Sequence, residues 1–380
     1  MIRIGYDGKR AVQNFTGLGN YSRYVIDAMQ TYYPDERYCL YAPKPKENPQ
    51  LTELLERSGG CTTVHYPRVA LWKELNALWR IGGMRANLEE DRIDLFHGLS
   101  NELPLNIHRV RGMKSVVTIH DLIFMHLPHC YPAIDRAIYD CKSRYACRRA
   151  DHIIAVSECT KRDIIRFYNI PESKISVIYQ GCDSVFSKKV SLEEQERVRQ
   201  RYKLPARYML SVGSIEERKN TLVALQALNY LPDDLHLVLV GKYTPYTDKL
   251  IAYAAEAGLK HRLHICHGIP FADLPVIYQR ADTFIYPSLY EGFGIPILEA
   301  LNSCLPVVAA TGSCLEEAGG PDSLYADPHD AETMAAAVRE TLRPEVKQRM
   351  IEKGLNWASR FTLQQMAEQT MDCYREVLRL

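Results

Sequence analysis

The sequence has no hydrophobic run long enough to cross a membrane. None of its apolar stretches reaches the 18 or so residues that a membrane-spanning helix needs. Residues 1–6 read as a β-strand and not as a signal peptide. We therefore expect a protein of the cytosol.

The sequence also lacks the usual signs of a metal site or a P-loop. Its 11 cysteines are scattered without any Cys-x-x-Cys pair, which favours reduced thiols over disulfides or bound zinc. His261, His264 and His267 recur at every third residue, but in a predicted strand alternate residues point to opposite faces, which argues against a zinc site. There is no Asp-x-Asp pair and no Gly-x-x-x-x-Gly-Lys-Ser/Thr sequence. We expect no bound metal.

A large charge of one sign is missing as well. The net charge is +1, but residues 1–180 carry 25 Lys and Arg against 20 Asp and Glu (+5), and the remainder carries 22 against 26 (−4). The first half should meet an anionic partner more readily than the second, although charged surface residues alone explain a surplus of this size. We expect no nucleic-acid partner.

Short apolar runs alternate with helical patterns along the whole chain, which predicts an α/β protein with parallel sheets. In the first half the expected strands are 2–6, 38–42, 62–66, 95–97, 115–119, 152–155 and 175–179. In the second half they are 208–212, 235–240, 263–266, 283–286 and 306–309. Each half is therefore predicted to form a Rossmann-like domain.

The polar segment 184–206 separates the two α/β patterns. Within it, Ser191 is a candidate helix cap before Leu192-Glu193-Glu194. Apolar residues at helical spacing predict a terminal helix in the last segment. We predict an N-terminal domain over 1–183, a linker over 184–206, a second domain over 207–361 and a terminal helix over 362–380.

Arg218 and Lys219 lie side by side just after the strand 208–212 and before a helix. Ligands of open α/β sheets bind at the carboxyl ends of strands, and an adjacent guanidinium and ammonium suit a diphosphate. An exposed pair of cations at a helix entrance is the plainer interpretation of this pair taken alone.

A second loop, residues 287–300, follows the strand 283–286. Gly292 and Gly294 allow the backbone to approach a ligand, and a helix beginning near Ile295 presents unpaired amides to an anion. Glu291 and Glu299 can accept hydrogen bonds from hydroxyl groups of a sugar and a ribose. The loop therefore predicts a site for a nucleotide sugar.

These residues carry a resemblance to a known family. Glu291 and Glu299, with seven residues between them, match the E-x7-E motif of retaining glycosyltransferases of the two-Rossmann-domain type, and the run resembles glycosyltransferase family 4 at Ser288, Glu291, Gly292, Phe293, Gly294, Pro296, Glu299 and Ala300. The Gly17-Leu18-Gly19 loop and the His120-Asp121 pair are similar to that family's glycine loop and His-Asp pair. Segment 311–320 follows the family only loosely, and we assign it no role.

The resemblance implies two domains facing across a cleft (GT-B type), with a terminal helix that crosses back to the first domain. It implies catalytic roles for His120, Arg218, Lys219 and Glu291, and donor contacts from Gly17, Gly19, Ser214, Ser288, Gly292, Phe293, Gly294, Ile295 and Glu299. It also implies retention at the anomeric carbon. We expect transfer from a nucleoside diphosphate sugar, with a lean towards mannose from GDP-mannose, to a saccharide or lipid-linked saccharide of cell-surface polysaccharide synthesis.

Several alternatives stay open. Gly17-x-Gly19 resembles a dinucleotide fingerprint, but Ser22 replaces its third glycine, which argues against an NAD-dependent oxidoreductase. His120 alone would also suit a packed or capping histidine. A UDP-sugar transferase, an epimerase, a phosphorylase or a non-catalytic sugar-binding or scaffold protein could have the same fold.

A stripe at 71–80 places Trp72, Leu75 and Trp79 on one helical face. Most such stripes face the core. The alternative is an interfacial helix that gives peripheral contact with the inner face of a membrane through the N-terminal domain, with basic residues Arg109, Arg111, Lys114, Lys142, Arg144, Arg148 and Arg149 in support.

Overall fold

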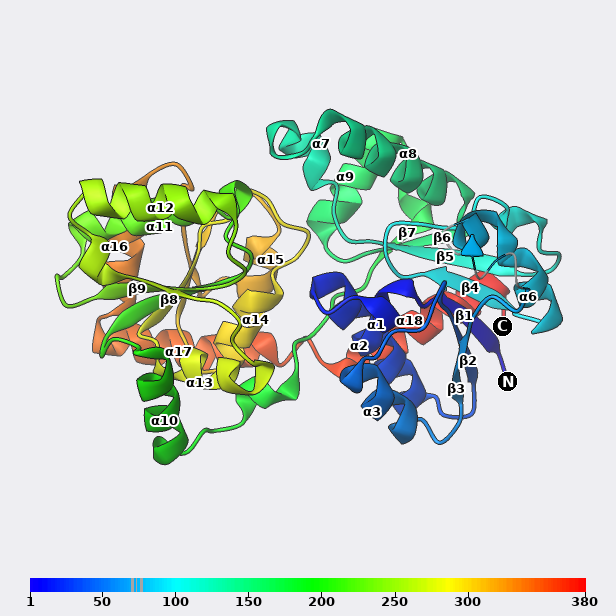
Figure 1. Ribbon diagram of the computed structural model, residues 1–380, viewed down its shortest axis with the longest axis horizontal. Helices are drawn as coiled ribbons and strands as arrows, with labels where there is room; N and C mark the ends of the chain where they lie inside the picture. The colour runs from blue at the N-terminus through cyan, green and yellow to red at the C-terminus, as the bar shows by residue number, and fades with distance from the viewer. Residues whose placement is uncertain (70–71, 73, 76–77) are drawn as a thin grey trace. The chain divides into compact units, whose positions relative to one another are not determined.

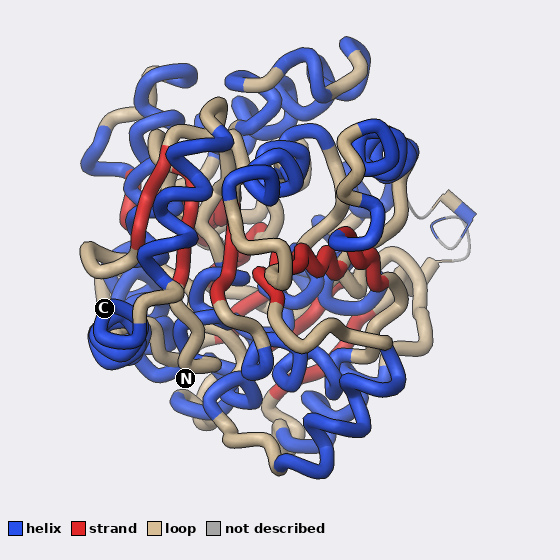
Figure 2. Tube along the Cα trace, turned by 90° about the vertical axis from the view of Figure 1, so that its left-hand side faces the viewer, coloured by secondary structure: helices blue, strands red, loops and turns tan. Residues whose placement is uncertain are grey.

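A computed structural model describes residues 1–69, 72, 74–75 and 78–380. The chain forms two compact units, one of Met1–Gln180 with Thr362–Leu380 and one of Gly181–Phe361. In the tube view the strands lie among helices (Figure 2). The segment predicted as a linker, 184–206, belongs to the second unit. It contains a helix that begins after Ser191, whose hydroxyl accepts from the Glu194 amide as a cap.

Unit 1 is built on a parallel sheet in the order β3-β2-β1-β4-β5-β6-β7. Its strands are β1 (Arg3–Asp7), β2 (Arg37–Tyr41), β3 (Thr62–His65), β4 (Leu95–Gly98), β5 (Lys114–Ile119), β6 (His152–Ala155) and β7 (Ile175–Val177). Its described helices are α1 (Lys9–Gln13), α2 (Gly17–Tyr32), α3 (Pro49–Arg57), η1 (Trp79–Gly83), α6 (Arg85–Glu90), η2 (Ile107–Arg109), α7 (Ile123–His126), η3 (Pro128–Cys130), α8 (Ala133–Arg149), α9 (Glu158–Tyr168), η4 (Glu172–Lys174) and α18 (Leu363–Leu378). The strand order reverses between β1 and β4, which is where open α/β sheets bind ligands.

Unit 2 repeats this plan with a parallel sheet in the order β10-β9-β8-β11-β12-β13. Its strands are β8 (Tyr208–Val212), β9 (His236–Val240), β10 (Leu263–Cys266), β11 (Thr283–Tyr286), β12 (Val307–Ala310) and β13 (Leu324–Ala326). Its helices are η5 (Ser184–Ser187), α10 (Leu192–Tyr202), η6 (Glu217–Lys219), α11 (Thr221–Ala227), η7 (Leu228–Tyr230), α12 (Pro245–Glu256), η8 (Lys260–Arg262), η9 (Phe271–Asp273), α13 (Leu274–Arg280), α14 (Ile295–Asn302), α15 (Leu315–Gly319), α16 (Ala331–Thr341) and α17 (Pro344–Ala358). Here the order reverses between β8 and β11.

Helices cover both faces of each sheet (Figure 1). In unit 1, α8 and α9 lie on one face and α2, α3 and α18 on the other; in unit 2, α11, α12 and α16 lie opposite α13, α14 and α17. The central strands are buried because both faces are covered, and this explains their continuous apolar runs. All the predicted strands are present, with ends that differ by at most two residues, and β13 is an addition.

Helix α18 packs against α2 and completes the interior of unit 1. The Tyr374 hydroxyl lies 2.6 Å from Nδ1 of His97, whose Nε2 lies 2.8 Å from Oγ1 of Thr118. Burial lowers the pKa of His97 to about 3, so this imidazole is neutral at pH 7. A buried hydrogen-bond chain therefore fixes α18 to β4 and β5.

Across the parts of the chain that the structure describes, no helix combines the length and the apolar character needed to span a membrane.

Candidate active site

The predicted donor residues of unit 2 gather where the strand order reverses. Arg218 and Lys219 lie in η6 just beyond β8, and residues 287–294 follow β11. The Leu289 amide donates to the Arg218 carbonyl over 2.9 Å. Asn220, whose φ of +52° is left-handed, donates from Nδ2 to the Pro287 carbonyl over 3.2 Å. These bonds hold the two loops side by side.

Both cations meet one carboxylate. Nζ of Lys219 lies 2.5 Å from Oε1 of Glu291, and Nη1 of Arg218 lies 3.2 Å from Oε2 of Glu291. Nζ of Lys219 also donates to the Tyr286 hydroxyl over 2.6 Å, and Nε of Arg218 lies 3.1 Å from Oε2 of Glu216. The structure therefore brings Arg218, Lys219 and Glu291 together as one charged cluster.

The cluster stays ionised despite its burial. Burial raises the pKa of the Glu291 carboxyl, but the charges of Lys219 and Arg218 lower it by more, so the pKa lies below its usual value. Burial lowers the pKa of the Lys219 ammonium, but Glu291 and Tyr286 raise it by more. Burial raises the pKa of Tyr286 to about 12, so its hydroxyl remains a donor at neutral pH. Glu291 is thus a charged acceptor, and Lys219 a charged donor.

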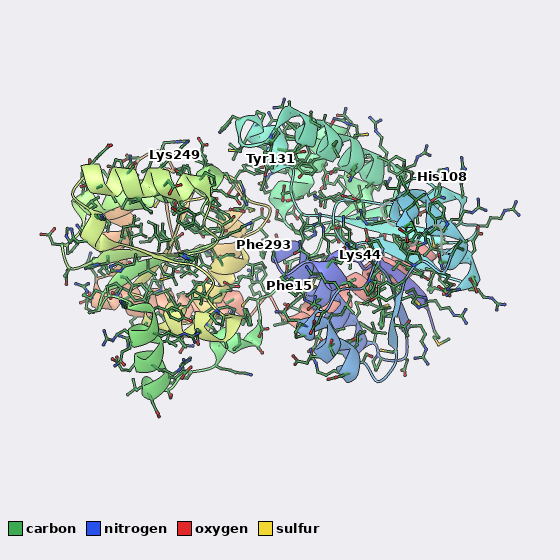
Figure 3. The ribbon with its side chains drawn as sticks, viewed as in Figure 1. Phe15, Lys44, His108, Tyr131, Lys249 and Phe293 are labelled. Atoms are coloured by element: carbon green, nitrogen blue, oxygen red, sulfur yellow. The ribbon has the colours of Figure 1, made fainter. Side chains whose placement is uncertain are left out.

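The turn before α14 has a conformation that suits glycine. Gly294 has φ +147°, and a Cβ there would lie 3.1 Å from Cβ of Ala318. Ile295 is the first residue of α14, whose amides no side chain caps. Sγ of Cys314 lies 2.7 Å from the carbonyl oxygen of Phe293 (labelled in Figure 3). The predicted helix N-terminus is therefore present, with Gly292, Phe293 and the buried Ser288 on the loop that precedes it.

Glu299 lies one turn inside α14 and has its own partner. The Tyr278 hydroxyl, from α13, donates to Oε2 of Glu299 over 2.7 Å. Burial raises the pKa of Glu299 to about 7; the Tyr278 hydrogen bond lowers it and Asp183 raises it. Glu299 therefore changes charge near neutral pH.

A small pocket opens at the carboxyl ends of β8 and β9. Residues that line it include Gly213, Ser214, Lys219, Thr221 and Tyr286. The buried Oγ1 of Thr221 has no hydrogen-bond partner. Ser214 thus lines the same pocket as Lys219, and the pocket offers a hydroxyl donor as well as a cation.

Sequence reasoning did not find Tyr278, Tyr286 or Cys314. Tyr286 is the last residue of the predicted strand 283–286, and Tyr278 lies between two predicted strands. Only the fold shows that their hydroxyls reach Lys219 and Glu299. Cys314 falls in the segment 311–320, to which no role was assigned.

The remaining predicted residues lie in unit 1. A Cβ on Gly19 would lie 1.9 Å from the Asn14 carbonyl oxygen, so this loop requires glycine, whereas a Cβ on Gly17 would meet nothing within 4 Å. His120 follows β5, and its Nε2 lies 2.8 Å from the Leu99 carbonyl oxygen. Because a carbonyl can only accept, Nε2 carries the proton and Nδ1 is an acceptor. Burial lowers the pKa of His120 to about 4, so the ring is neutral at pH 7.

The aromatic stripe at 71–80 lies partly outside the described residues, which exclude Leu71, Lys73, Asn76 and Ala77. Trp79 is fully buried and donates from Nε1 to Oδ1 of Asn87 over 3.1 Å. Trp72 packs against the same core, and Leu75 is exposed. Trp79 is therefore part of the core, as the plainer interpretation of the stripe expects.

Comparisons with known proteins identify the family of the chain. A family model described as Glycosyltransferase Family 4 matches residues 31–186, and one described as Glycosyl transferases group 1 matches residues 193–357. The chain is 32% identical to the O-antigen chain mannosyltransferase B of Escherichia coli, over 74% of each chain. It is 27% identical to the O-antigen chain mannosyltransferase RfbU of Salmonella typhimurium, over 60% of each chain.

Among solved structures, Anabaena Alr3699/HepE in complex with UDP-glucose has the same fold, with a TM-score of 0.77 and 18% identity over 99% of this chain and 100% of that one. Fold, site and relatives together define a glycosyltransferase of the GT-B class. The chain belongs to glycosyltransferase family 4, with the group 1 domain as its second unit.

Proposed function

We propose that this glycosyltransferase moves a mannosyl residue from GDP-mannose to a saccharide or lipid-linked saccharide acceptor during synthesis of a cell-surface polysaccharide. The proposal includes retention at the anomeric carbon and no metal ion. The mannosyltransferase names of the bacterial relatives support the sugar. The observation that carries the proposal is the ionised Arg218–Lys219–Glu291 cluster at the switch point of unit 2.

The charges in the cluster suit the chemistry of the reaction. Breaking the bond between sugar and phosphate leaves negative charge on the departing diphosphate, and fixed donors that stabilise it lower the barrier. Arg218, Lys219 and the uncapped amides at Ile295 are such donors. Glu291, an ionised carboxylate, would accept hydrogen bonds from the sugar hydroxyls, and Glu299 from the ribose. His120, with Gly17 and Gly19, remains a predicted donor contact from unit 1.

A UDP-sugar donor is the alternative that an observation favours. Alr3699/HepE was solved with UDP-glucose and shares the fold. At 18% identity, however, this likeness supports the fold alone. The higher identity to mannosyltransferases makes GDP-mannose the first donor to test.

A donor screen tests the proposal. The purified protein is examined by thermal shift and donor hydrolysis with GDP-mannose, UDP-glucose and UDP-N-acetylglucosamine, all in EDTA. We expect stabilisation by GDP-mannose that Lys219→Ala abolishes and the exposed-surface control Lys249→Ala retains. Stabilisation by no donor would favour a non-catalytic sugar-binding or scaffold protein, and a requirement for added metal would contradict the mechanism.

Donor affinity should depend on pH through Glu299. Its pKa is raised to about 7, so the carboxylate that would accept from the ribose is present above pH 7 and is protonated as the pH falls. We expect the KM for GDP-mannose to rise by roughly tenfold per pH unit well below pH 7 and to level off above about pH 8. Initial rates between pH 5.5 and 8.5 measure this profile.

Two variants assign the profile to Glu299. Glu299→Gln should remove the titration, because the amide carries no charge at any pH. Tyr278→Phe removes the hydrogen bond that lowers the pKa of Glu299, so its midpoint should move to higher pH. An unchanged profile in both variants would assign the titration to another group.

Peripheral membrane contact is proposed for a different surface from the predicted stripe. Leu78, Ile81 and Leu105, here called the Leu78 patch, are exposed by 52%, 39% and 55%. The Leu105 amide donates to the Ile81 carbonyl over 2.8 Å, which places these two residues together. Exposed apolar side chains near Arg109 suit an anionic lipid surface.

Vesicle sedimentation tests this contact. The protein should sediment with phosphatidylglycerol vesicles at low salt, and the Ile81→Glu/Leu105→Glu variant should stay in the supernatant. Leu192→Glu is the matched control, because Leu192 is 82% exposed in unit 2. Equal sedimentation of all three proteins, or none by the original protein, would contradict the contact.

A further inference from the structure

Unit 1 has a second charged cluster, at its own switch point. Asp7, the last residue of β1, is 3% exposed. Nε of Arg80 donates to Oδ1 of Asp7 over 3.1 Å and to Oδ2 of Asp7 over 3.0 Å. Nη1 of Arg80 lies 2.5 Å from Oε2 of Glu102, and Oε1 of Glu102 lies 3.3 Å from Nζ of Lys142. Both carboxylates are therefore committed to Arg80, with Lys142 at the rim.

Two further cationic side chains near this cluster form no ion pair with a carboxylate of the described residues. Lys9 and Arg10 begin α1, one residue after β1, are half-buried, and make no ion pair within the described part of the chain. Nε of Arg10 is buried and lacks a hydrogen-bond partner. Four cations thus face two carboxylates, which leaves a surplus of two positive charges.

The surplus positive charge lowers the pKa of neighbouring basic groups. Burial and the charges of Arg80 and Arg10 lower the pKa of Lys9, against Glu102 and Asp7, which raise it. Arg10 also contributes to the lowered pKa of His120. Arg10 therefore lies near His120, and Lys9 near Asp7 and Glu102, at the carboxyl end of the unit 1 sheet.

Unpaired cations at such a place need an explanation. Burying a charge or a guanidinium N–H without a partner costs free energy, and protein side chains normally supply the partner. Here the nearby acids are taken by Arg80, and the crevice outside the strand ends is where α/β sheets receive ligands. A guanidinium beside an ammonium matches the geometry of an oxyanion.

We propose that Lys9 and Arg10 bind an oxyanion group, phosphate or carboxylate, carried by the acceptor. The inference rests on the proposed function, since it assigns the acceptor to unit 1 beside His120. It requires an anionic acceptor and predicts that a neutral saccharide binds poorly. Arg80 serves as a scaffold for the cluster, because its donors are already bound to Asp7 and Glu102.

Calorimetric titration of the full-length protein tests the site. The probes are glucose 6-phosphate, glucuronate and neutral glucose, and the variant is Lys9→Gln/Arg10→Gln. We expect both anions to bind more tightly than glucose, and the variant to weaken them by about 10- to 100-fold, the worth of one or two charge-assisted hydrogen bonds. The relative affinity of the two anions shows which oxyanion fits.

Controls separate binding from folding. Lys188→Gln/Lys189→Gln removes an adjacent exposed pair of lysines and should leave all affinities unchanged. The Tm of Lys9→Gln/Arg10→Gln should stay the same or rise, because no internal ion pair is broken; a falling Tm would indicate a structural role and overturn the proposal.

The donor screen distinguishes the two proposals. If GDP-mannose stabilises the protein but Lys9→Gln/Arg10→Gln binds all probes like the original, the oxyanion site is wrong and the proposed function stands. If no donor binds while the Lys9- and Arg10-dependent anion binding persists, the proposed function fails and the assignment of the site to an acceptor fails with it.

Discussion

Lys219→Met is expected to lower the transfer rate by about 100- to 1000-fold, the usual effect of removing one fixed donor to a developing negative charge. Lys219 is the cation closest to Glu291 and lines the pocket of unit 2. The loss should appear in kcat at saturating donor, measured by release of nucleoside diphosphate. Activity within about tenfold of the original would show that Arg218 and the helix amides suffice.

The same substitution should destabilise the protein, because it removes a partner of the buried Glu291 carboxylate. Breaking a buried ion pair from one side costs on the order of 3–5 kcal/mol when the remaining charge has no other partner, and because Arg218 still pairs with Glu291 we expect a smaller loss here. The double variant Lys219→Met/Glu291→Gln should therefore recover much of the lost Tm without recovering activity. A double variant as inactive and as unstable as the single one would indicate general unfolding instead of loss of charge.

Glu291→Gln should separate product binding from catalysis. Glu291 pairs with both cations, so a diphosphate must compete with it, and removing this like charge is worth on the order of 1–2 kcal/mol. GDP should bind roughly tenfold more tightly, while transfer falls by at least about tenfold because the sugar hydroxyls lose a charged acceptor. Calorimetry with GDP and a steady-state assay measure the two effects.

Glu216→Gln is the matched control for this prediction. The substitution removes one carboxylate charge beside Arg218, as Glu291→Gln does. The Glu216 side chain is 43% exposed, however, so solvent screens its interaction with Arg218. It should change GDP affinity by less than about threefold. If Glu216→Gln and Glu291→Gln tighten GDP equally, the effect belongs to net charge and not to the cluster.

Most of the fold could be predicted from the sequence, because a strand covered on both faces needs a continuous apolar run. β11 (Thr283–Tyr286) and β12 (Val307–Ala310) have that signal. β13 (Leu324–Ala326) was missed because it has only three residues at the sheet edge, two of them partly exposed, and they carry little of that signal. Segment 184–206 was predicted as a linker because α10 is highly charged, although it packs on α13 within unit 2.

For the donor site, the sequence could predict only which types of residue lie near two strand ends, and not which side chains contact each other. Sequence placed Arg218, Lys219 and Glu291 at neighbouring strand ends but could not show that one carboxylate neutralises both cations, since 72 residues separate Lys219 from Glu291. For the same reason the sequence could not show that Tyr278 contacts Glu299 or that Arg80 contacts Asp7. Each of these pairings depends on side-chain direction after packing, which no local pattern encodes.

The placement of α18 has a consequence for how the chain is made. Residues 362–380 follow unit 2 in the sequence but fold with unit 1. A ribosome therefore completes all of unit 2 before Tyr374 can reach His97. During that interval the face of α2 that α18 covers is exposed, and Nδ1 of His97 lacks its Tyr374 partner, so the newly made chain should depend on chaperones longer than its number of domains suggests.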